Sequence, residues 1–154
     1  MISEISPSKE ILQATIDRFW ETFPPVWNRI RSRIHSVATQ NFDITVEQFH
    51  ILRHVRKGVD SVSDLATEKR ISRPAISQAV HILVHKGLLT RHPDAADRRC
   101  VRLELTESGS ALLSAIFENN RAWMAQKLAA LSQEQLLGLV QALDILRQTF
   151  DERV

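Results

Sequence analysis

Two polar clusters in the middle of the chain have residue types and a spacing suited to contact with nucleic acid. The first lies in Ser72-Arg73-Pro74-Ala75-Ile76-Ser77-Gln78, where a capping serine and an early proline predict the first turn of a helix. The first turns of a helix can present side chains to base edges, where arginine suits guanine and glutamine suits adenine. A helix N-terminus and a serine hydroxyl can also hold a phosphate. The candidates for DNA contact in this segment are Ser72, Arg73, Ser77 and Gln78.

The second cluster is the polar loop of residues 94–99. Its adjacent Arg98 and Arg99 suit insertion into the minor groove, where the negative potential is strongest over narrow A·T tracts. An unpaired Asp97 would repel the phosphates of DNA. We therefore expect Asp97 to pair with a nearby arginine and to orient the loop. Alone, the loop is explained more simply as a surface hairpin with local salt bridges. Beside the first cluster, DNA contact becomes the favoured interpretation, and either arginine could enter the groove.

The segments around these clusters predict the elements that would position them. Three helix starts are predicted by residues that can cap a first turn: Thr45 with Gln48, Ser61, and Ser72. Gly58 and Gly87 are well placed to end the first and third of these helices. Two runs that alternate like strands, residues 88–92 and 100–105, then flank the polar loop. This order predicts a winged helix-turn-helix over residues 44–105.

Amphipathic segments on both sides of this centre predict further helices. Apolar residues recur at helical spacing over residues 8–21, and Pro24-Pro25 is expected to interrupt that helix because proline lacks an amide hydrogen. A second helix is predicted to start at Pro25. After the centre, a long helix is predicted from Thr106 to about Leu131, and a last one after a Ser132–Gln135 capping box.

These expectations define a mainly α fold with a small β-hairpin wing, divided into three parts. Residues 1–43 would be N-terminal helices of a dimer frame, residues 44–105 the winged helix-turn-helix, and residues 106–154 C-terminal dimerisation helices. The apolar stripes of the terminal helices are typical of a core or of contact with a partner helix.

The charge of the chain is concentrated in its centre. Residues 53–102 hold eleven of the twenty Lys and Arg residues and five of the eighteen acids, a net charge of +6, whereas the rest of the chain carries −4. A basic centre between acidic flanks indicates a polyanion bound by the centre alone. No apolar run approaches the roughly 18 residues of a membrane span. The acidic N-terminus is unlike a signal peptide, and a single cysteine fits a reducing cytoplasm, so we expect a cytoplasmic protein.

The central segment resembles the MarR family of bacterial transcriptional regulators. The matching residues, in order, are Thr45-x-x-Gln48-Phe49-x-Ile51-Leu52, Ser63-x-Leu65-Ala66, Ser72-Arg73-Pro74-Ala75-x-Ser77, Leu83-x-x-Lys86-Gly87-Leu88-Leu89, Asp97-Arg98-Arg99, Leu105-Thr106 and Gly109. The order and spacing of these motifs are highly specific, whereas the flanks match only as helices.

The resemblance implies a homodimer with intertwined terminal helices and one winged helix from each chain. Such proteins bind pseudo-palindromic double-stranded DNA, commonly as repressors, and often release it when a small-molecule effector binds between the frame and the winged helix. The resemblance assigns recognition roles to Ser72, Arg73, Ser77 and Gln78, and wing roles to Asp97, Arg98 and Arg99. A separate helix before Pro24-Pro25 would exceed the family minimum, and we expect it to add to the dimer interface or to cover the effector cleft.

Other residue types with chemical potential have simpler interpretations. Aromatic residues of the framework helices are mostly expected in the core, but Trp20, Trp27 and Phe49 are candidates for an effector pocket. The pairs His50/His54 and His81/His85 have a spacing that can hold a metal, but two ligands are not a site, so no metal is expected. Cys100 is interpreted as a plain strand residue rather than a redox sensor.

No catalytic residues and no cofactor are expected, because the sequence has no glycine-rich phosphate loop, nucleophile elbow or HExxH motif. Acids such as Asp64 and Asp94 are at ordinary positions in a capped helix and a turn. The favoured function is a ligand-responsive repressor that binds DNA as a homodimer. The alternative is a winged-helix module for protein–protein assembly without specific DNA binding, and the salt dependence of DNA affinity discriminates the two.

Overall fold

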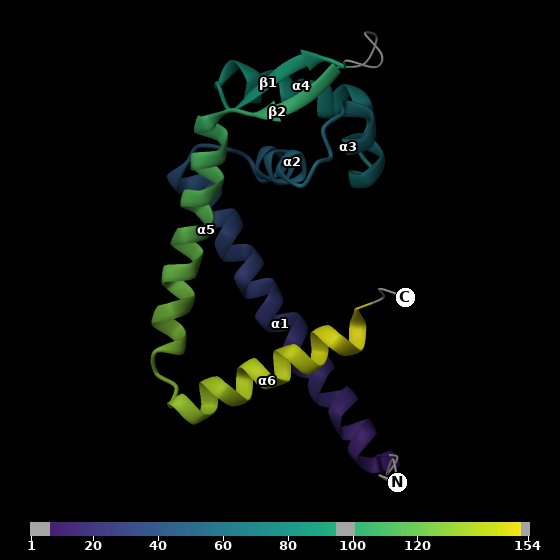
Figure 1. Cartoon of the computed structure of the whole chain (residues 1–154), viewed down its shortest axis with the longest axis vertical. Helices are drawn as coiled ribbons and strands as arrows, with labels where there is room; N and C mark the ends of the chain where they lie inside the picture. The colour runs from purple at the N-terminus through teal and green to yellow at the C-terminus, as the bar shows by residue number, and fades with distance from the viewer. Residues whose placement is uncertain (1–6, 95–100, 152–154) are drawn as a thin grey trace. The chain divides into compact units, whose positions relative to one another are not determined.

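A computed structural model describes residues 7–94 and 101–151 of the chain (Figure 1). Its elements in order are α1 (Lys9–Asn41), α2 (Val46–Arg56), α3 (Val62–Lys69), α4 (Arg73–His85), β1 (Leu89–Pro93), β2 (Val101–Leu105), α5 (Glu107–Leu128) and α6 (Gln133–Phe150). The chain forms two compact units, residues 1–117 and residues 118–154, and α5 belongs to both. The mainly helical fold with one β-hairpin is confirmed.

The N-terminal helix differs from the prediction. We expected Pro24-Pro25 to separate two helices, but α1 continues through both prolines as one helix (Figure 1). Each interior proline leaves the carbonyl four residues earlier without a helical partner, here at Trp20 and Glu21. Both of these residues are exposed, so water can satisfy their carbonyls, and the helix-forming segments on either side maintain the helical path. The N-terminal segment is therefore the first part of α1 and not a separate helix.

The helix starts predicted after Thr45, Ser61, Ser72 and Ser132 are confirmed by their side-chain caps. Thr45 accepts a hydrogen bond from the Gln48 amide at 3.1 Å, and the Gln48 side chain accepts one from the Thr45 amide at 2.9 Å. Ser132 and Gln135 form the same reciprocal pair at the start of α6. Each pair satisfies amides that have no partner within the helix. Ser8, Ser61 and Ser72 also cap the helices that follow them.

The winged-helix core is built from the inward faces of α2, α3, α4 and the hairpin. Its largest fully buried side chains come from all of these elements and from the neighbouring parts of α1 and α5: Phe49, Ile51, Leu52, Leu65, Ile76, Leu83, Leu89, Leu113, Ile116, Val37 and Val80. β1 and β2 are antiparallel, with Leu89 opposite Leu105 and Pro93 opposite Val101. The Leu103 amide donates to the Asp60 carbonyl at 2.7 Å, which ties the loop before α3 to β2.

Two helices carry large apolar side chains that the single chain leaves exposed. On α6 no residue is buried, and Leu137, Val140, Leu143 and Ile145 are each more than half exposed. The part of α1 up to Trp27 likewise exposes the following residues: Ile11, Leu12, Ile16, Trp20, Phe23, Val26 and Trp27. Soluble monomers seldom expose contiguous apolar faces of this kind, so each helix offers a surface for a partner.

The start of α5 lies directly against the chain at the end of α4. Thr106 donates from its hydroxyl to the Gly87 carbonyl at 2.6 Å, and its amide donates to the Leu88 carbonyl at 3.2 Å. A Cβ atom on Gly109 would overlap the Leu88 carbonyl oxygen. Only glycine therefore permits α5 to pack this closely on the turn between α4 and β1.

We predict that Gly109→Ala destabilises the protein by about 1–3 kcal/mol, the range typical of a methyl group forced into a packed site. The matched control is Gly138→Ala in α6, where a Cβ would meet no atom within 4 Å. That change should instead stabilise the helix by about 0.5–1 kcal/mol, because alanine loses less backbone entropy. Urea denaturation of both variants measures the two effects. Equal stability of the two variants would contradict the packing role of Gly109.

Candidate nucleic-acid interface

The two sides of α4 have different chemistry. Ile76, Val80 and Leu83 are fully buried in the core. The four residues predicted from sequence are all exposed on the start of the same helix: Ser72, Arg73, Ser77 and Gln78. The N-cap hydroxyl of Ser72 accepts from the Ala75 amide at 3.4 Å, so the helix begins where the sequence predicts. Burial of one side thus presents the polar side to an external ligand.

A tight turn between α3 and α4 orients this polar face. Arg70 ends α3 in the left-handed conformation, with φ of 54°, and its amide donates to the Thr67 carbonyl at 3.2 Å. The next amide, of Ile71, donates to the Ala66 carbonyl at 3.1 Å. These bonds satisfy two of the last carbonyls of α3 and place Ser72 immediately after the turn. The geometry is that of a helix-turn-helix, in which the second helix is available to enter a groove.

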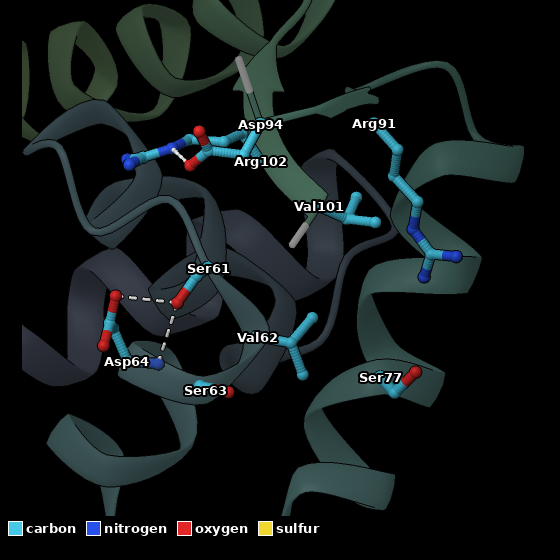
Figure 2. Close-up of a pocket in the computed structure, with 9 residues that line it drawn as sticks. All are labelled: Ser61, Val62, Ser63, Asp64, Ser77, Arg91, Asp94, Val101 and Arg102. Carbon is cyan, nitrogen blue, oxygen red and sulfur yellow. Dashed lines mark hydrogen bonds and ion pairs between the residues drawn. The ribbon is translucent and has the colours of Figure 1, made fainter. Parts of the chain in front are cut away.

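A groove of about 580 Å³ lies where α3, α4 and the hairpin meet (Figure 2). Its lining residues are Ser61, Val62, Ser63, Asp64, Ser77, Arg91, Asp94, Val101 and Arg102. Arg91 extends from β1 toward α4, on which Ser77 lies (Figure 2). Arg91 was not among the residues predicted from sequence, although its place in the first strand-like run and its positive charge were visible there. It adds a cation to the polar side of α4.

The predicted wing tip lies outside the described residues. Asp97, Arg98 and Arg99 fall between β1 and β2 in the sequence, and their assignment to the minor groove stays a prediction. The same holds for Cys100. β1 and β2, which precede and follow this segment in the sequence, are paired along their length.

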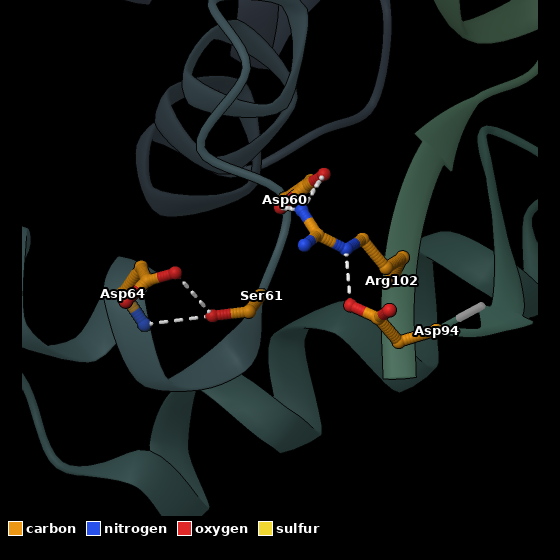
Figure 3. Close-up of polar contacts among 5 residues, drawn as sticks. All are labelled: Asp60, Ser61, Asp64, Asp94 and Arg102. Atoms are coloured by element: carbon orange, nitrogen blue, oxygen red, sulfur yellow. Dashed lines mark hydrogen bonds and ion pairs between the residues drawn. The ribbon is translucent and has the colours of Figure 1, made fainter. Parts of the chain in front are cut away.

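Three acids near the groove are held by neighbouring side chains (Figure 3). Arg102 binds Asp94 through Nε at 2.6 Å and Asp60 through Nη1 at 2.8 and 2.9 Å. These two carboxylates raise the pKa of Arg102 further above its ordinary value, first through the hydrogen bond to Asp60. Asp64 accepts a hydrogen bond from the Ser61 hydroxyl at 2.7 Å. The acids therefore have structural partners, as expected for a capped helix and a turn.

The three candidates for an effector pocket occupy different environments. Phe49 is only 1% exposed and packs beside Phe117, with 6.0 Å between ring centroids. Trp20 and Trp27 are 67% and 48% exposed on α1. His35 of α1 lies 6.3 Å from the Phe49 ring, and Trp20 lies about 22 Å along the helix from His35, at about 1.5 Å per residue. Within one chain, Trp20 and Phe49 therefore do not line one pocket.

Two histidine rings, those of His35 and His50, lie beside Phe49. His50 lies 5.1 Å from His35 between ring centroids, and burial together with the charge of Lys69 lowers the pKa of His50 to about 4. Burial also lowers the pKa of His35, with a smaller effect from Arg31. His54 donates from Nδ1 to the His50 carbonyl at 2.7 Å. Over the residues that the structure describes, no group of three His, Cys, Asp or Glu side chains is arranged to hold a metal ion.

The comparisons with known proteins agree with this geometry. Residues 42–99 match the model of a family described as the MarR family. An HTH-type transcriptional regulator of Mycobacterium tuberculosis, MT0903.1, is 28% identical over 96 residues, which cover 62% of this chain and 67% of that protein.

Solved structures have the same fold. The transcriptional regulator Tm0710 of Thermotoga maritima superposes with a TM-score of 0.81 at 23% identity, over 88% of this chain and 95% of that one. FabT of Streptococcus pneumoniae, in a complex with DNA, superposes with a TM-score of 0.64 at 20% identity, over 89% and 98%.

The arrangement of α2, α3, α4 and the hairpin defines a winged helix-turn-helix protein. At its centre, residues 42–99 match the MarR family model, in agreement with the resemblance that the sequence motifs carry. Among the described residues, no helix combines the length and the apolar character needed to cross a membrane.

The histidine cluster generates a prediction for the pH dependence of stability. The unfolded chain binds a proton on His50 near its ordinary pKa of 6.5, whereas the folded chain binds it only near 4. Acidification between these two values therefore favours the unfolded state, and the protein should lose stability as pH falls below about 6.5. We expect His50→Gln to reduce this loss in urea titrations at pH 7 and pH 5. If the variant lost as much stability between pH 7 and pH 5 as the wild type, His50 would not be the cause of the acid sensitivity.

Proposed function

We propose that this protein is a transcriptional regulator that binds double-stranded DNA as a homodimer and represses transcription until a small-molecule effector releases it. The observation that carries the proposal is the polar face at the start of α4. Its residues are exposed because the opposite face of the helix is buried in the core. Arginine and glutamine in the first turns match the donors and acceptors of base edges in the major groove. The DNA-bound structure of FabT, which has the same fold, supports this use of the domain.

Charge supports the same partner. The net charge of +6 over residues 53–102 lies on the winged-helix segment and not on the helices that flank it. Such a distribution directs a polyanion to α4 and the hairpin. Arg98 and Arg99 would extend the contact to the minor groove next to the major-groove segment that α4 contacts. A location in the cytoplasm, expected from the sequence, is consistent with access to DNA.

The exposed apolar faces of α1 and α6 support a homodimer. Each chain would bury these faces against its partner, so residues 1–43 and 106–154 would form the frame and residues 44–105 the DNA-binding parts. Two copies related by twofold symmetry would read a pseudo-palindrome. Half-sites are then expected about one helical turn apart, roughly 10 bp.

The region around Phe49 supports an effector site. Phe49, His35 and Phe117 bring together side chains from α2, α1 and α5. Arg56 lies 4.8 Å from the centre of the Phe117 ring and adds a cation. A small molecule that separated these side chains would shift the winged helix relative to the helices of the frame, and would thereby change the spacing of the two α4 helices.

The test is binding of the purified protein to its own upstream DNA, followed by fluorescence anisotropy in a salt series beside a random duplex. We expect tighter binding to the upstream DNA, and an affinity that falls with salt by about 0.9 log units per phosphate contact per decade. The alternative, a protein–protein assembly module, would be favoured by two results together. The protein would bind all duplexes equally weakly, and it would bind fragments selected from the genome no more tightly.

Arg73→Ala tests the role of α4 directly. If Arg73 reads a base, the variant should lose about 1–3 kcal/mol of binding free energy at the preferred sequence and should discriminate less between bases there. Competition with duplexes that carry single base-pair changes measures this. An equal loss on every sequence would assign Arg73 to the phosphate backbone instead.

A further inference from the structure

We infer that Arg102 is a positioning residue for DNA binding. It fastens the wing hairpin to the loop before α3 and neutralises two carboxylates beside the groove. The effect of Arg102 on DNA affinity rests on the proposed DNA-binding function. The fastening of the hairpin by Arg102 can be measured without DNA.

The contact joins three separate parts of the winged helix (Figure 3). Arg102 comes from β2, Asp94 directly follows β1, and Asp60 precedes α3. Nη1 of Arg102 reaches both oxygens of Asp60, at 2.9 and 2.8 Å, and Nε reaches Asp94 at 2.6 Å. Next to it, the Leu103 amide donates to the Asp60 carbonyl at 2.7 Å. Asp60 is thus bound to β2 through both its side chain and its backbone.

The two carboxylates explain why an arginine is needed. The side chains of Asp60 and Asp94 are 27% and 13% exposed, so both are partly withdrawn from water. A planar guanidinium with a fixed fork of donors can bind two acids at once, which the single ammonium group of lysine does with poorer geometry. Without this cation, the negative charges of Asp60 and Asp94 would lack the guanidinium that neutralises them beside the groove. The Debye length is about 8 Å at physiological ionic strength, so salt would only partly screen these charges from a phosphate bound nearby.

Arg91 provides the contrast. It lines the same groove from β1, but no residue that the structure describes forms an ion pair with it. Its charge is available to a phosphate, whereas two donor groups of Arg102 are engaged by acids. The two arginines of one hairpin therefore have different roles: Arg91 can contact DNA, and Arg102 holds the hairpin that presents the contact.

The first test needs no DNA. In amide hydrogen exchange on the free, full-length protein, Arg102→Ala should accelerate exchange of the Leu103 amide by about tenfold or more, since local opening controls its protection. Arg73→Ala makes the same charge change at an exposed position on α4 and should leave this amide unchanged. Thermal unfolding of both variants establishes that each is folded. Equal protection of Leu103 in the wild type and in Arg102→Ala would overturn the fastening role.

The second test is a double-mutant cycle on DNA affinity. Arg102→Ala should weaken binding to the preferred duplex by about tenfold in the wild-type background. In the background of Asp60→Asn with Asp94→Asn it should weaken binding only about twofold, because the carboxylates that it neutralises are gone. Arg102→Lys should fall between the wild type and Arg102→Ala.

An equal loss in both backgrounds would make Arg102 a direct phosphate contact and would overturn the inference. If the wild-type protein bound no duplex preferentially, the proposed function would fail. The hydrogen-exchange result would then still decide whether Arg102 fastens the hairpin.

Discussion

Burial of one face of α4 is the constraint on which the rest of the structure depends. Ile76, Val80 and Leu83 are fully buried, so the helix can rotate very little about its axis without exposing them. The polar residues between them are consequently held toward the outside. Close packing of a core transmits this constraint to neighbouring elements, because interiors have few voids to absorb a shift. The orientation of the candidate recognition face is therefore set by hydrophobic packing and not by the polar residues themselves.

The hairpin and the start of α5 are attached to this core by short polar contacts. The Leu88 carbonyl accepts from the Thr106 amide on one side of the junction, and the Asp60 carbonyl accepts from the Leu103 amide on the other. The ion pairs of Arg102 with Asp60 and Asp94 lie beside the second contact. The winged helix is thus one packed body whose edges are joined by hydrogen bonds, and these bonds hold α4 and the hairpin in a fixed relation to each other.

The sequence predicted the winged helix well because its signals are local. Caps such as Thr45 with Gln48 specify helix starts from residues within one turn. Pro24-Pro25 was misinterpreted because the penalty of an interior proline depends on whether the freed carbonyls reach water, which the sequence does not state. Arg102 was not predicted as a bridge because its partner Asp60 lies forty-two positions away. Contacts of that kind depend on how strands and loops meet in three dimensions.

The central claim is that α4 lies in the major groove at two half-sites. Methylation interference on the preferred duplex tests it most directly, because methylation of guanine N7 blocks the major groove, whereas methylation of adenine N3 blocks the minor groove. The account predicts that guanine N7 methylation abolishes binding in two clusters about one helical turn apart, roughly 10 bp. Tight binding that tolerates methylation of every guanine, or a single cluster, would contradict it.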